Sequence, residues 1–92
     1  MTTERPDDVF RPWDIDQSED VDRAIGLLRA LNAAYSARIA HPRPGDDLEQ
    51  LRAERRRYAT EQRHLNPADQ PTIVRILTEY PAVLRQVRTG PP

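Results

Sequence analysis

Residues 18–40 read SEDVDRAIGLLRALNAAYSARIA, and HPRPG follows at 41–45. Apolar side chains recur in the first stretch at intervals of three and four residues: Val21, Ala24, Ile25, Leu28, Leu31, Tyr35 and Ile39. This spacing is typical of one broad face of an α-helix. Asp16 or Ser18 is suited to cap its first turn, because a short side-chain oxygen accepts from free backbone N–H groups. Two prolines and a glycine end the helix. The sequence therefore predicts a helix over about 18–41.

A second helix is predicted over about 46–65. Asp46 can cap it, with Glu49 in the third position. Its seam follows heptad spacing through Leu48, Leu51, Arg55, Tyr58, Gln62 and Leu65. Two of these six positions are polar, which is weak for a self-sufficient zipper. Because the connection is short, we expect this helix to pair with the first as an antiparallel hairpin.

The third segment, about 71–88, has helical periodicity after Pro71, which suits a first helical turn. Pro81 removes one backbone hydrogen bond, so we expect either a kink there or two short helices. The β-branched residues at 72–74 leave a strand open as an alternative. Residues 90–92 are expected to be a frayed tail. The predicted fold class is all-α.

Residues 1–16 are expected to be an extended acidic arm before a single helical domain at 17–89. Pro6 and Pro12 interrupt a helix in this segment. Charge is uneven along the chain, because residues 1–22 carry eight acids against two arginines, a net −6. The remaining residues carry seven acids against twelve arginines, a net +5. The arm also carries apolar groups: Val9, Phe10, Trp13 and Ile15.

Composition excludes several classes of protein. The chain has 92 residues, a net charge of −1 and no cysteine, so disulfides, thiolate nucleophiles and cysteine-based zinc sites are impossible. We find no apolar run that resembles a signal peptide or a membrane span, so we expect a cytoplasmic protein that has no membrane partner. All 14 basic residues are arginine, which we interpret as the codon bias of a GC-rich bacterial genome.

Catalysis is not expected. The two serines and two histidines (Ser18, Ser36, His41 and His64) lie outside any strand-turn-helix setting for a nucleophile. The three glycines are scattered, so no phosphate-binding loop exists. Gly26 is expected to mark a close helix–helix contact. We therefore predict a protein that is not an enzyme and has no cofactor.

Two other functions remain open. Arg52, Arg56 and Arg63 fall along one stripe of the second helix, able to follow a phosphate backbone in a DNA-binding regulator. A pI near 6.1 argues against a dedicated nucleic-acid binder. Glu61 and His64 form a Glu-x-x-His pair, which would suit a metal-binding helical bundle. A solvated charged face is the favoured explanation of both patterns.

The favoured prediction is a small non-catalytic interaction or regulatory protein that binds a protein partner of unknown identity. The apolar share is only 37%, so the core is thin and a partner surface would help it. Large aromatic residues often anchor interfaces. The expected partner-binding residues are Phe10, Trp13, Tyr35 and Tyr58. A homodimer that buries surplus apolar surface of the hairpin is expected.

Overall fold

The computed structural model describes residues 12–90, with side chains from Ser18 onward, and this part of the chain consists of three helices. They are α2 (Pro12–Ala40), α3 (Leu48–Arg63) and α4 (Gln70–Thr89). No strand occurs among the described residues. The all-α prediction is confirmed. Over the same range, no helix has both the length and the apolar character needed to cross a membrane.

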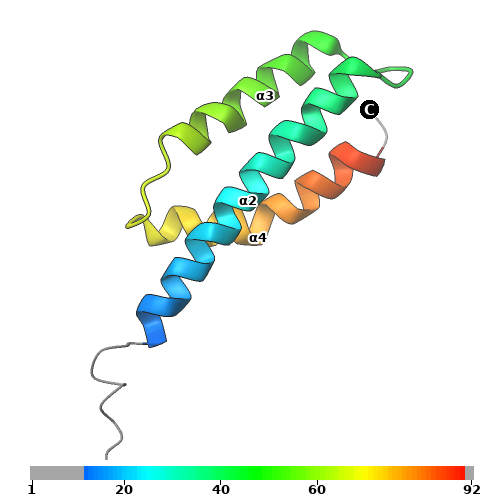
Figure 1. Ribbon diagram of the computed structural model, residues 1–92. Coiled ribbons are helices and arrows are strands. Elements are labelled where there is room, and N and C mark those ends of the chain that lie inside the picture. The colour runs from blue at the N-terminus through cyan, green and yellow to red at the C-terminus, as the bar shows by residue number, and fades with distance from the viewer. Residues whose placement is uncertain (1–11, 91–92) are drawn as a thin grey trace, which may run out of the picture.

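α2 is the central helix, and α3 and α4 both pack against it. In Figure 1, α3 runs alongside the C-terminal half of α2, whereas α4 crosses α2 and continues toward its C-terminal end. Within residues 12–90, the backbones of α3 and α4 do not pack directly on each other. Long side chains join these two helices instead, as described below. α2 therefore supplies the surface on which the other two helices fold.

Pairs of side chains confirm that α2 and α3 form an antiparallel hairpin. Near the middle, the rings of Tyr35 and Tyr58 stack with centroids 5.7 Å apart. The two polar positions of the α3 seam find polar partners on α2: Asn32 Nδ2 donates to Gln62 Oε1 at 3.4 Å, and Arg55 Nη1 donates to Ser36 Oγ at 3.1 Å. The polar residues that weakened the predicted zipper therefore match hydrogen-bonding groups on the partner helix.

α4 is a single helix, so the strand alternative for residues 72–74 is wrong. Asp69 caps its N-terminus and accepts from the Thr72 amide at 3.3 Å, and Pro71 lies in the first turn. These signals outweigh the modest β preference of three branched residues. The helix continues through Pro81, and its two halves run in different directions in Figure 1. The expected kinked helix is therefore present, without a break into two.

The core contains residues of all three helices: Ala24, Leu28, Leu31, Tyr35, Tyr58, Ile73, Ile76, Tyr80 and Val87. Among residues 18–90, Val74 is the single large apolar side chain that is exposed, at 54%. α4 therefore covers the part of the α2 face that we expected to remain open. In this part of the chain, surplus apolar surface gives no reason for a homodimer.

The N-terminus of α2 differs from the prediction. The helix begins at Pro12, so residues 12–16 are helical and do not belong to an extended arm. Proline is tolerated in a first helical turn, where its missing N–H has no partner, and the acids that follow favour the positive end of a helix. The rest of the predicted arm, residues 1–11, and the tail at 91–92 lie outside the described residues.

The start of α3 also differs by one residue. The N-cap is Asp47, whose side chain accepts from the amides of Glu49 and Gln50 at 3.0 and 3.2 Å. Asp46, the predicted cap, has a different partner, described in the next subsection. Gly45 precedes both with φ of 89°, a left-handed conformation that glycine adopts without strain.

Gly26 does not mark a helix–helix contact, contrary to the prediction. It is exposed, and a Cβ built on it would have no neighbouring atom within 4 Å. The two helices that cover α2 both lie on its other faces.

Candidate interaction surfaces

Tyr35 and Tyr58, predicted to bind a partner, are core residues with exposures of 7% and 3%. Tyr58 lies between Tyr35 and Tyr80, stacking on the first ring and meeting the second edge-on with centroids 5.2 Å apart. Burial raises the pKa of Tyr35 to about 12, because the charged phenolate would lose its hydration there. Both tyrosines therefore lie in the core of the chain and not on an open surface: Tyr58 packs against Tyr80 of α4, whose position was not predicted, and Tyr35 packs against Tyr58.

Glu61 links α3 to α4 through a compact polar cluster. The Tyr80 hydroxyl donates to Glu61 Oε1 at 2.5 Å and accepts from Arg75 Nη1 at 3.0 Å. Arg75 Nη2 donates to Glu61 Oε2 at 2.6 Å. Both carboxylate oxygens of Glu61 are therefore bound within the protein, and His64 is exposed at the C-cap of α3. No group of three or more metal-ligating side chains gathers among the described residues.

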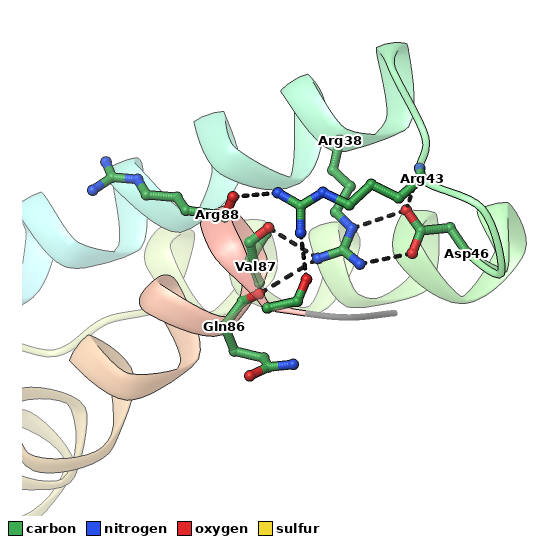
Figure 2. Close-up of polar contacts among 7 residues, drawn as sticks. Arg38, Arg43, Asp46, Gln86, Val87 and Arg88 are labelled. Atoms are coloured by element: carbon green, nitrogen blue, oxygen red, sulfur yellow. Dashed lines mark hydrogen bonds and ion pairs between the residues drawn. The ribbon is translucent and has the colours of Figure 1, made fainter.

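A buried arginine ties the loop after α2 to the end of α4 (Figure 2). Arg38 Nε and Nη2 donate to the two carboxylate oxygens of Asp46 at 2.9 and 2.7 Å, a bidentate pair. Arg38 Nη1 donates to the carbonyl of Val87 at 3.0 Å. The side chains of Arg38 and Asp46 are only 6% and 2% exposed. Because an isolated buried charge is costly, this pair fixes the loop geometry.

Arg43 completes the same end of the molecule. Its backbone amide donates to Asp46 Oδ2 at 2.9 Å, and its guanidinium donates to the carbonyls of Arg88 and Gly90. Hydrogen bonds from Arg38 and then from the Arg43 amide lower the pKa of Asp46 to about 2. The arginine side chains thus satisfy the free carbonyls at the negative end of the α4 dipole. Below, these contacts are called the arginine clamp.

The clamp was missed by sequence reasoning, although one signal was present. Arg38 falls three residues after Tyr35 and seven after Leu31, which puts a charged residue on the buried face of the helix. A charge at such a position requires a partner. The sequence does not say which carboxylate supplies it, because Asp46 and Asp47 are adjacent and equally suited to cap α3.

Beside the clamp, a hollow of about 450 Å³ opens between α2 and α4. Its lining includes the apolar residues Ala33, Ala37 and Val87 and the polar residues His41, Arg43 and Arg88. We call these six residues the basic groove. Among the residues that the structure describes, no acidic side chain lines the hollow. Arg38, also on its wall, is neutralised by Asp46, whereas the Arg43 guanidinium binds only carbonyl oxygens. The groove therefore has an excess of positive charge.

The predicted arginine stripe lies on α3. Arg52, Arg56 and Arg63 are all exposed. Within residues 18–90, Arg52 and Arg56 have no carboxylate partner, and Arg63 donates to Thr60 Oγ1 at 3.4 Å. Neighbouring Arg57, by contrast, pairs with Glu54 at 2.9 Å. The stripe is therefore an open cationic surface rather than part of an ion-pair network.

Of the two remaining predicted partner residues, Phe10 lies outside the described residues, and Trp13 is described in its backbone alone, as part of α2. The core begins at Ala24, with Val21 packed partly against it, and Ser18 and Glu19 are exposed. Residues 12–20 of α2 therefore precede the first core contact that the described side chains make. In Figure 1 this end of α2 projects beyond the other two helices.

Comparisons with known proteins give no assignment: no protein-family model matches the chain, and neither curated proteins nor solved structures include a match.

Proposed function

We propose that this chain is a small non-catalytic interaction protein of the cytoplasm, which binds a protein partner through the projecting end of α2 and the acidic segment before it. The observation that carries the proposal is the length of α2 beyond its core. Nine residues of α2, 12–20, precede Val21, the first core contact among the side chains that the structure describes. At 1.5 Å per residue, they correspond to roughly 13 Å of helix.

A projecting helix with this composition is suited to binding another protein. A short helix is marginal in water unless a neighbour stabilises it, so the projecting end is only partly stabilised by the fold itself. Its sequence includes Trp13 and Ile15 among acids, and residues 1–22 carry a net charge of −6. The chemistry that would complement this segment is an apolar recess bordered by cations.

The proposal is tested by photo-crosslinking in cells of the native host. A benzoylphenylalanine at position 13 should give a discrete adduct. The same group at Arg52, exposed on the outer surface of α3, is the matched control. Absence of an adduct at position 13, or equal adducts at both positions, would refute the proposal. The mass of the adduct distinguishes a second copy of the chain from a different protein.

The open arginine stripe supports a second candidate, a DNA-binding regulator. Phosphate contacts by Arg52 and Arg56 would make binding weaken steeply with salt. An Arg52→Ala/Arg56→Ala variant should then elute from heparin at lower salt than the parent chain. An Arg85→Ala variant, which removes one exposed arginine from α4, is the control. A parent chain that heparin does not retain at low salt would exclude this candidate.

A further inference from the structure

The basic groove and the acidic N-terminal segment have complementary charge and lie at opposite ends of the same helix. The groove borders the last turns of α2. Arg43, from the loop after α2, and Arg88, from the end of α4, both line it. The segment before α2 contributes three acids, Glu4, Asp7 and Asp8, and two more, Asp14 and Asp16, follow in the first turns of α2 itself. The question is whether the segment can bind the groove of its own chain.

Chain geometry favours binding between copies over binding within one copy. The helical rise of 1.5 Å per residue separates Pro12 from Arg38 by about 39 Å. A fully extended chain covers at most about 3.6 Å per residue, so Asp8 reaches roughly 14 Å from Pro12 and Glu4 roughly 29 Å. Asp14 and Asp16 are fixed within α2 itself. The near end of the groove, at Ala33, lies about 32 Å from Pro12. Asp7 and Asp8 therefore fall well short of the groove on the same molecule, and Glu4 alone approaches its near end.

We propose that the basic groove binds the acidic N-terminal segment of a second copy of this chain. Two copies with antiparallel α2 helices place each segment beside the groove of the other, which gives a closed two-fold dimer. Arg43 and Arg88 face acids of the segment, and the apolar lining of Ala33, Ala37 and Val87 receives an apolar side chain such as Phe10. This inference rests on the proposed role of the N-terminal segment and names its partner.

Arg88 is the residue to change, because its exposed side chain makes no hydrogen bond within the described residues and its backbone carbonyl survives substitution. In sedimentation velocity at low salt, the parent chain should form dimers. Arg88→Glu should raise the dimer dissociation constant about tenfold or more, because it replaces an attraction with a repulsion. Arg85→Glu, at an exposed position of α4 that does not line the groove, makes the same change in charge and should leave the constant unchanged.

A charge-exchange experiment tests the pairing directly. Asp7→Arg/Asp8→Arg should also weaken the dimer, and a mixture of this variant with Arg88→Glu should restore association. A photo-crosslinker at position 10, in a mixture of normal and isotope-labelled chains, should give adducts between copies that map to residues 33–43 or 87–88.

A purified protein that stays monomeric, a dimer that Arg88→Glu leaves unaffected, or adducts that map elsewhere would each overturn the inference. These results leave the proposed function standing if crosslinking from position 13 in cells still captures a different protein. An absence of adducts in cells, together with a monomer in solution, would remove both.

Discussion

The polar cluster between α3 and α4 gives a sharp test of what holds the third helix in place. Tyr80→Phe removes one hydroxyl, which donates to Glu61 and accepts from Arg75, and keeps the buried ring. A hydrogen bond to a charged group contributes about 1.5–3 kcal/mol when buried. The Glu61 and Arg75 side chains are 21% and 40% exposed, so water replaces part of that contribution. We expect a loss of about 1–2 kcal/mol.

The assay is urea unfolding followed by far-ultraviolet circular dichroism, in a double-mutant cycle with Glu61→Gln. Thermal unfolding gives a second measurement, because for a domain of this size each kcal/mol of unfolding free energy shifts the melting temperature by roughly 4–8 °C. The coupling energy between Tyr80 and Glu61 should be about 1 kcal/mol. Glu79→Gln is the matched control, because Glu79 lies 3.9 Å from the same Arg75 in an exposed i,i+4 pair. That change should cost no more than about 0.5 kcal/mol.

A coupling energy indistinguishable from zero would refute the reasoning. It would mean that apolar packing against α2 alone holds α4, and that the hydroxyl contributes nothing to joining α3 and α4. A loss of stability in Glu79→Gln as large as that in Tyr80→Phe would also contradict the reasoning. Both effects would then reflect the charge of Arg75 and not the hydrogen bonds of the Tyr80 hydroxyl.

Three other predictions concern stability. Leu31→Ala, at a position of 0% exposure, should lower the free energy of unfolding in urea by about 2–5 kcal/mol. Val74→Ala, at an exposed position, should change it by less than about 0.5 kcal/mol. Equal losses in the two variants would contradict the described core. Gly26→Ala should raise the free energy of unfolding by about 0.5–1 kcal/mol in the same assay, because the added Cβ meets open space. A lower free energy of unfolding would mean that this face of α2 is covered. The pKa of Asp46 is lowered from 3.8 to about 2, so its carboxylate stabilises the fold above pH 3.8 and this contribution disappears as the pH falls through 2. In Asp46→Asn, the free energy of unfolding should therefore depend less on pH between 3.8 and about 2, as followed by an acid titration. An unchanged dependence on pH would exclude the Asp46–Arg38 pair as its source.

The helical hairpin could be predicted because its signals are local and agree with one another. Apolar periodicity predicts which face of α2 is buried, and the prolines and glycine of the loop fix where the chain turns. The polar seam residues Arg55 and Gln62 weakened the predicted self-pairing, yet they match Ser36 and Asn32 on α2. Periodicity alone predicts where these residues point, but not which groups they meet.

The parts that were not predicted depend on tertiary context. Asp46 is as good a cap as Asp47 by local rules, and the buried guanidinium of Arg38 decides between them. Tyr35 and Tyr58 were assigned to a partner surface because nothing local indicates that α4 covers them. The basic groove is formed by residues from α2, the following loop and α4, so no single sequence window reveals it.

The arginine clamp has a consequence for the order in which the protein matures. α2 and α3 precede α4 in the chain, so a hairpin that forms before α4 docks lacks the carbonyls of Val87, Arg88 and Gly90 as partners. Until α4 docks, Arg38 and Arg43 each hold donors that only water can satisfy. Docking of the last turn of α4 thus completes the hydrogen bonds of both guanidinium groups.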